Sequence, residues 1–222
     1  MQRFDYHRPA TLDEARRLKA SIAGSRYIAG GTDLLVQKPR DLVDGVPAFV
    51  GRSTDLRTIE TTADGLRLGA SVTLGDLEDS AVACGWIDGL RDLTDVFASR
   101  LVRNRATVAG NLVNASPIGD LTVLLLALDA ELELHTADNE RRLPLGRFYR
   151  GYKDLDLQPG EVVTAVRVPR RVASDGLSYE KISQRRNLDI ASVNSVLRVG
   201  LDDGGLVTHA ALAVGGVAPV PL

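Results

Sequence analysis

The sequence is poor in the residues that metal centres and disulfide bonds require. Its 222 residues include one cysteine, Cys84, and three histidines, at positions 7, 135 and 209. A single thiol cannot close an internal disulfide, so a cytoplasmic protein is expected. It also cannot supply the four cysteine ligands of a typical iron–sulfur cluster, and the histidines lack metal-ligand spacing. We therefore predict no metal ion in this polypeptide.

An excess of charge and a long apolar run are missing as well. Lys and Arg together number 27 against 29 Asp and Glu, which gives a net charge of -2. This balance disfavours nucleic acid as the main partner, because a phosphate-binding surface needs a basic excess. The longest apolar run, 123–128, is too short to span a bilayer. Two short basic clusters, RLVRNR (100–105) and KISQRR (181–186), suit a small anionic ligand better than a duplex.

Several familiar catalytic and nucleotide-binding motifs are also absent. The chain has no GxxxxGK[ST], no GxGxxG after a strand, no GxSxG and no HExxH. These absences argue against a P-loop, a standard dinucleotide fingerprint, a nucleophile elbow and a zinc-protease helix. No catalytic side chain is predicted.

Two small-residue turns remain, AGGTD (29–33) and TVAGN (107–111). Glycine lets a backbone approach an anion closely, and consecutive N–H groups in such a turn form a nest of positive potential. Thr32 and Thr107 add hydroxyl donors, so the two turns could hold a pyrophosphate from two sides. Either turn alone is more often structural, because glycine is the default residue of tight turns.

Asp120 has two interpretations as well. It lies nine residues past Asn111, where its carboxylate could accept hydrogen bonds from a ribose. It also opens the apolar stretch DLTVLLLALDA (120–130), where it would be the N-cap of a buried helix. The residues alone leave both interpretations open.

The periodicity of the chain predicts an α+β fold. Helices are expected to begin at Thr11, with Glu14 completing a capping box, and at Thr73 with Asp76, the second running to about residue 82. Further helices are expected at 86–98 and 120–130, and strands at 27–29, 66–70, 131–136, 161–168, 178–183, 190–200 and 206–215. The apolar residues 34–36 should pack behind the first turn. These elements divide into an N-terminal lobe (1–50), a second lobe (51–172) and a C-terminal lobe (173–222).

Five segments, in this order, resemble one known family: FDYHRPATLDEA (4–15), AGGTDLL (29–35), RNRATVAGNLVNASPIGD (103–120), GYKDLDLQPGE (151–161) and YEKISQRRNLDIASV (179–193). The chain is similar, from about residue 3 to its end, to the FAD-binding subunit or middle domain of the molybdenum hydroxylases. That group includes xanthine dehydrogenase and carbon monoxide dehydrogenase. The resemblance implies a two-lobed FAD-binding fold of the PCMH type, followed by a C-terminal α+β lobe with a three-stranded antiparallel sheet.

The resemblance also implies which residues bind FAD. One turn would hold the pyrophosphate with Ala29, Gly30, Gly31, Thr32, Asp33 and Leu34, and the other with Thr107, Val108, Ala109, Gly110 and Asn111. Asp120 would bind the adenosine ribose while also capping its helix, and Phe97 would lie near the adenine or the flavin. Val163 and Lys181 would lie beside the isoalloxazine, where an ammonium group stabilises the anionic reduced ring.

Three departures from the family pattern bear on these expectations. In the family the second turn commonly reads GGN, and here Ala109 replaces the first glycine. This replacement is harmless only if residue 109 has a negative φ. Family members usually continue past GGVAP, so the third lobe is expected to be truncated and to lack its closing helices. Leu188 precedes Asp189 where the xanthine enzymes tend to have an acidic residue, which puts the use of NAD in doubt.

The resemblance implies an electron-transfer role. Electrons would pass from a small [2Fe-2S] subunit to FAD in this chain, and then to NAD, a quinone or oxygen, while a large partner subunit holds the molybdenum cofactor in a heterotrimer. One alternative is a stand-alone FAD-dependent oxidase of the same flavin fold. The other is a non-catalytic scaffold subunit that has lost FAD, which Ala109 and the short C-terminus suggest.

Overall fold

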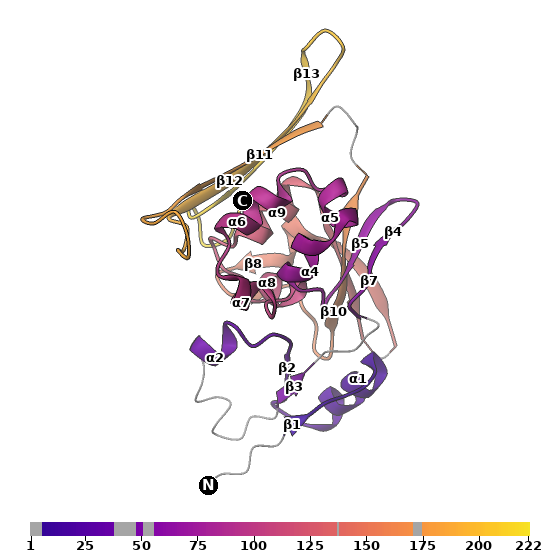
Figure 1. The fold of residues 1–222 in the computed structure, drawn as a ribbon. Helices are drawn as coiled ribbons and strands as arrows, with labels where there is room; N and C mark the ends of the chain where they lie inside the picture. Colours follow the sequence, from indigo (N-terminus) through magenta and orange to yellow (C-terminus); the bar gives the residue numbers. More distant parts are fainter. Residues whose placement is uncertain (1–5, 38–47, 51–55, 137, 171–174) are drawn as a thin grey trace.

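The computed structural model describes residues 6–37, 48–50, 56–136, 138–170 and 175–222. Successive parts of the chain form three layers, with the N-terminal lobe at the bottom of Figure 1 and the C-terminal sheet at the top. Helices and sheets alternate along the chain, which confirms the predicted α+β class. The expected lobe boundaries, 50–51 and 172–173, fall at or within segments outside the described residues.

The N-terminal lobe has a parallel sheet with the strand order β1-β3-β2, formed by β1 (Tyr6–His7), β2 (Arg26–Ile28) and β3 (Ala48–Val50). Two helices, α1 (Leu12–Ser21) and α2 (Leu34–Gln37), accompany it. The Thr11 hydroxyl accepts a hydrogen bond from the Glu14 N–H, as expected of a cap. The Glu14 carboxylate, however, accepts from the N–H of Ala10, so the predicted capping box is displaced by one residue.

The second lobe contains an antiparallel sheet with the order β4-β5-β10-β6-β7. Its strands are β4 (Ile59–Thr61), β5 (Gly65–Gly69), β6 (Glu131–His135), β7 (Glu140–Pro144) and β10 (Val162–Pro169). A short hairpin, β8 (Tyr149–Gly151) and β9 (Asp154–Leu155), lies beside it. The helices are α4 (Leu74–Asp79), α5 (Ala81–Trp86), α6 (Leu90–Val96), α7 (Arg100–Arg103), α8 (Val108–Val113), α9 (Asp120–Ala127) and α10 (Leu145–Phe148).

The core lies between this sheet and helices α4 to α9, which gather on one side of it in Figure 1. Leu68, Leu132 and Val166 from the strands meet Leu77 and Leu124 from the helices, and all five are fully buried. The predicted buried helix is confirmed, since every residue of α9 except Leu126 is buried.

Two predicted helices differ in their limits. The helix expected from 73 to about 82 ends at Asp79, because the Ser80 hydroxyl accepts from the Ala83 N–H and caps a new helix, α5. The helix expected over 86–98 is shorter, because Gly89, at φ 72°, precedes its first turn. A serine cap and a glycine therefore break this region into shorter helices than its apolar pattern predicted.

The C-terminal lobe is the predicted three-stranded antiparallel sheet, with the order β11-β12-β13. Its strands are β11 (Asp175–Ile182), β12 (Val193–Leu201) and β13 (Val207–Gly215). Residues Val196 and Ala213 are buried on the face that packs against α9. Across the parts of the chain that the structure describes, no helix is both long and apolar enough to cross a bilayer.

Candidate functional site

The structure brings the two small-residue turns together through one close approach. A Cβ atom at Gly30 would lie 1.8 Å from the carbonyl oxygen of Arg105, so only glycine fits at this position. The Arg105 Nε atom also donates a hydrogen bond to the Gly30 carbonyl, at 3.2 Å. Because Thr107 follows Arg105 by two residues, this contact places the first turn next to the second.

The first turn has donors to offer a ligand. Within the described residues, the backbone N–H groups of 30–33 donate no hydrogen bond. Gly31 adopts φ 71°, a left-handed conformation that glycine accepts without strain. Several unpaired N–H groups in one tight turn form the concave donor set that binds a phosphate group. This half of the site therefore offers backbone donors that a phosphate could accept from, and the binding of FAD there stays a prediction.

The residues after the first turn depart from expectation. Leu35 and Val36 are 55% and 76% exposed, so they form no buried support for the turn, although the Leu35 side chain lies against Gly31. The Asp33 carboxylate accepts from the Gln37 side chain at 2.9 Å and not from a helix N–H. Asp33 contributes to α2 through its carbonyl, which accepts from the N–H groups of Val36 and Gln37.

The second turn is the start of helix α8 and not a nest, so that prediction is wrong. The N–H of Val108 donates to Val72, and that of Ala109 donates to Ala70. The N–H groups of residues 110 and 111 both donate to Thr107, one to its hydroxyl and one to its carbonyl. No backbone donor of residues 108–111 is left for an anion.

Side chains are what the second turn can present to a ligand. The Thr107 hydroxyl accepts from Gly110 at 3.1 Å and keeps its own proton for donation. The Asn111 Oδ1 atom is buried and has no hydrogen-bond partner among the described residues. A buried polar atom without a partner is uncommon in folded proteins, so the Asn111 oxygen marks a place where a hydrogen-bond donor of a ligand would be accepted.

Ala109 is compatible with this geometry. It lies inside α8, is buried, and is not among the residues with positive φ. An alanine in a helical conformation carries no backbone penalty. The loss of the family's glycine therefore removes no conformation that this turn uses.

Asp120 is enclosed by donors from the C-terminal sheet. Its Oδ1 atom accepts from the Tyr179 hydroxyl at 2.9 Å and from the Asn194 amide at 2.5 Å. Its Oδ2 atom accepts from the Lys181 ammonium at 2.9 Å. The predicted capping role is wrong, because Gly119 is the N-cap of α9 and no side chain caps that end. Asp120 instead joins α9 to β11 and β12.

The other predicted flavin contacts divide into two groups. Lys181 donates at 3.0 Å to the carbonyl of Val96, the neighbour of Phe97, so Phe97, Asp120 and Lys181 lie in one region. Beside them is an open pocket of about 320 Å³, lined by Val96, Lys181, Ile182, Ser183, Arg185 and Arg186. Val163 is 4% exposed and pairs with Leu134 in the central sheet, and its contact with the flavin stays a prediction.

Burial and charge perturb one hydroxyl in this cluster. Burial raises the pKa of Tyr179, and the adjacent Asp120 carboxylate raises it further. The tyrosine therefore stays protonated and donates to Asp120 at every physiological pH. Lys181 and Asp120 have side chains only 5% and 9% exposed, so their ion pair is shielded from water.

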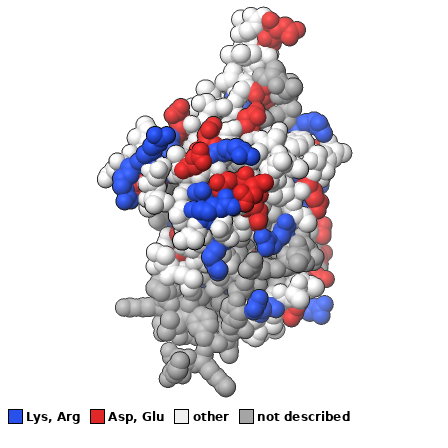
Figure 2. All heavy atoms as spheres, viewed as in Figure 1, with Lys and Arg blue, Asp and Glu red and all other residues white. Residues whose placement is uncertain are grey.

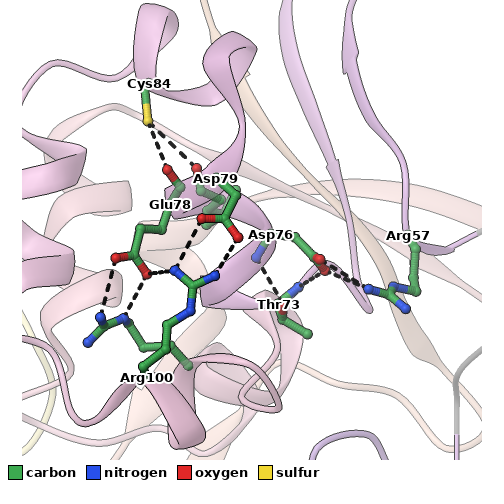
Figure 3. A network of polar contacts seen from close by, with 9 residues as sticks. Arg57, Thr73, Asp76, Glu78, Asp79, Cys84 and Arg100 are labelled. Carbon is green, nitrogen blue, oxygen red and sulfur yellow. Dashed lines mark hydrogen bonds and ion pairs between the residues drawn. The ribbon is translucent and has the colours of Figure 1, made fainter.

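Most arginines of the basic cluster 100–105 form ion pairs with carboxylates of the same protein, including the Arg100 pairs in Figure 3. Arg100 forms ion pairs with Glu78 and Asp79, and Arg103 binds Glu78 through two nitrogens. The hydrogen bond from Arg100 holds the pKa of Asp79 below its usual value. Figure 2 shows basic and acidic groups lying against each other over the central helices. Of the three arginines, only Arg105 directly contacts the first turn.

Sequence reasoning missed several residues of the site. Tyr179 lies two positions before Lys181 on β11, so strand alternation alone places both on one face. Asn194 and Glu78 gave no such local signal, because their partners lie 74 and 25 residues away in the chain.

The comparisons with known proteins identify the domain. Residues 2–171 match the family described as the FAD binding domain in molybdopterin dehydrogenase, and residues 178–222 match the CO dehydrogenase flavoprotein C-terminal domain. The chain belongs to this flavoprotein family. The suspected resemblance is thus confirmed, and FAD is the cofactor of the domain.

Curated relatives and solved structures agree with this assignment. The xanthine dehydrogenase FAD-binding subunit of Escherichia coli O157:H7 is 30% identical over 225 residues, which cover 98% of this chain and 75% of that subunit. Xanthine dehydrogenase of Emericella nidulans is 32% identical over 99% of this chain, but the chain spans only 17% of its length. Carbon monoxide dehydrogenase from Hydrogenophaga pseudoflava has a TM-score of 0.90 and 28% identity, covering 100% of this chain and 77% of that one.

The residues of this flavoprotein fit FAD unequally. Among the described residues, the N–H groups of 30–33 that donate no hydrogen bond and the close approach at Gly30 suit a dinucleotide phosphate, whereas the Asn111 oxygen, an acceptor without a partner, suits a donor such as a hydroxyl group of the ligand. The Asp120 carboxylate already receives three hydrogen bonds, so the ribose would have to share it. The relatives are components of oxidoreductases, and this chain corresponds to their FAD-binding part.

Proposed function

We propose that this chain is the electron-transfer flavoprotein of a multi-subunit molybdenum hydroxylase. FAD supplies an isoalloxazine ring that accepts and releases electrons. The support is the family match over residues 2–171 together with the similarity to carbon monoxide dehydrogenases, one of which is named as a copper- and molybdenum-containing enzyme. A single cysteine in these 222 residues cannot supply the four ligands of a typical cluster, which supports an iron–sulfur relay held outside this domain.

The chain's own residues would divide the work of holding FAD. The N–H groups of 30–33 bind the pyrophosphate from one side. The Thr107 hydroxyl donates to it from the other side, and the Asn111 side-chain oxygen would accept from a hydroxyl group of the cofactor. The remaining residues of the two turns, Ala29, Leu34, Val108, Ala109 and Gly110, shape the backbone around it.

The flavin end of the cofactor would lie in the open pocket beside Lys181. There the ammonium group, fixed by Asp120 and the Val96 carbonyl, keeps a positive charge close to the ring. A fixed cation in a partly dry site stabilises a negative charge more than a mobile solvated one. Phe97 adds an apolar wall next to Val96. Asp120 acts chiefly by holding Lys181 and secondarily by meeting the ribose.

The proposed partners are a large molybdenum-cofactor subunit and a small [2Fe-2S] subunit, with NAD, a quinone or oxygen as the external acceptor. The 30% identity to a xanthine dehydrogenase FAD-binding subunit supports this assembly. Leu188, which precedes Asp189, favours an acceptor other than NAD if the acidic residue of the xanthine enzymes serves NAD at that position.

Anaerobic flavin reduction tests this function. The purified chain, reconstituted with FAD, is mixed with candidate organic substrates, first alone and then with its two co-purified partner subunits. We expect non-covalent FAD, released intact by acid, and flavin bleaching only when the partners are present. Bleaching by an organic substrate without partners would establish a stand-alone oxidase, and a failure to retain FAD would establish a scaffold.

A further inference from the structure

Arg103 is a buried cation that the proposed electron transfer does not use directly. The residue is 9% exposed. Its Nε and Nη2 atoms donate to the two carboxylate oxygens of Glu78, at 2.9 and 3.3 Å. Its Nη1 atom donates to the carbonyl oxygens of Phe97 and Ala98, at 2.8 and 3.2 Å. A guanidinium group is rarely buried unless its geometry serves several partners at once.

The segment that Arg103 holds is conformationally unusual. Ala98 has φ 45°, in the left-handed region that a residue with a Cβ atom seldom adopts. Two residues earlier, the Val96 carbonyl accepts a hydrogen bond from the Lys181 ammonium at 3.0 Å. Three consecutive carbonyls, 96–98, are therefore held by two buried cations. These donors hold the segment around Ala98 in its strained conformation.

The anchor at the other end of this chain of contacts is helix α4. Glu78 lies in α4 and also accepts from the Arg100 guanidinium at 2.8 Å (Figure 3). The start of α4 is fixed by a full capping box between Thr73 and Asp76, and Asp76 in turn binds Arg57. Glu78 is thus a carboxylate of fixed position, and it orients the Arg103 fork toward the carbonyls of 97 and 98.

We propose that Arg103, oriented by Glu78, is a positioning residue for the flavin end of the site. It holds the segment 96–98 so that the Val96 carbonyl fixes the Lys181 ammonium and Phe97 keeps its place beside it. The inference rests on the proposed function, in which Lys181 lies next to the flavin. Arg103 acts through these residues and does not touch the cofactor.

The test compares Arg103→Lys with Arg100→Lys in the FAD-loaded chain. Lysine keeps the charge but cannot bind a carboxylate and two carbonyls in one plane. Arg100 shares Glu78 but contacts none of the carbonyls 96–98, so it is the matched control. The measurements are the midpoint potential of the bound flavin and its visible circular dichroism. For Arg103→Lys we expect a more negative potential and an altered dichroism spectrum, with neither change in Arg100→Lys.

Two further variants separate the possible failures. Glu78→Gln weakens the hold on Arg103 without removing it, so it should shift the potential in the same direction by less, whether or not Arg103→Lys folds. Asp79→Asn, which touches Arg100 alone, should not shift it. An unchanged potential in both Arg103→Lys and Glu78→Gln, or an equal shift in the controls, would overturn the inference.

Lys181→Met distinguishes this inference from the proposed function. If its potential is also unchanged, Lys181 does not lie beside the flavin and the placement in the proposed function fails. If Lys181→Met shifts the potential while Arg103→Lys and Glu78→Gln do not, the placement stands and only the role of Arg103 is refuted.

Discussion

Two adjacent glycines in the first turn meet different physical requirements. Gly30 has no room for a Cβ atom, because the Arg105 carbonyl occupies that place. Gly31 has φ 71°, and a Cβ atom there would meet the side chains of Leu35, at 3.0 Å, and Ile28, at 3.8 Å. A substitution at Gly31 therefore strains the turn whatever ligand it binds, whereas one at Gly30 separates the two turns. Substitution of Gly30 is therefore the more informative test of the cofactor site.

At the same scale, the ion pair of Asp120 and Lys181 should dominate local stability. Asp120→Asn leaves the buried ammonium without its counter-charge, and we expect a loss of about 3–5 kcal/mol in the free energy of unfolding. Chemical denaturation of the apo-protein measures it. The double variant Asp120→Asn/Lys181→Met, which removes both charges, should lose less than Asp120→Asn alone. Equal losses in the single and double variants would show that the pair is not coupled.

At the scale of secondary-structure elements, local sequence patterns were enough to predict some conformations, whereas others depend on partners that are distant in the sequence. Strand alternation and the apolar stretch 120–130 were enough to predict β6, β10, the C-terminal sheet and α9. The conformation of residues 107–111 was not predictable, because carbonyls of residues 70 and 72, distant in sequence, accept the N–H groups of that segment. The donors to Asp120 and the carboxylate that binds Arg103 were hidden for the same reason. The sequence was enough to predict that the first turn offers N–H donors. The residues that hold this turn in place could be identified only from the fold.

At the scale of the whole molecule, buried carboxylates make stability depend on acid. Glu161, just before β10, has a side chain 2% exposed and binds Arg141 of β7 at 2.6 Å; Arg141 also binds Asp156 after the β8–β9 hairpin. The hydrogen bond from Arg141 lowers the pKa of Glu161, and burial offsets this only in part. The stabilisation is complete above the ordinary pKa of 4.5 and is lost as the pH falls through the lowered value in the folded state.

Arg141→Met should therefore destabilise the protein by roughly 3 kcal/mol at neutral pH, because Glu161 is left buried without its counter-charge and keeps only the hydrogen bond from the Gln158 N–H. Its stability should also fall less steeply than that of the wild type as the pH drops below 4.5. Arg150→Met is the control, since Arg150 binds Asp156 but does not contact Glu161 and is 60% exposed. Denaturant titrations over a range of pH give both quantities. A parallel acid dependence in wild type and Arg141→Met would contradict this explanation.

The turn at 29–33 is proposed to hold the pyrophosphate of FAD because Gly30 lies against Arg105. The most direct test is the binding of FAD and of riboflavin, which lacks the pyrophosphate, to the apo chain and to Gly30→Ala. Gly85→Ala is the control, because Gly85, like Gly30, does not have a positive φ, and nothing lies within 4 Å of its Cβ position. We predict that Gly30→Ala weakens FAD binding at least about tenfold, or 1.4 kcal/mol, while riboflavin binding and the Gly85→Ala variant are unaffected. Unchanged FAD affinity in folded Gly30→Ala, or an equal loss for FAD and riboflavin, would contradict the account.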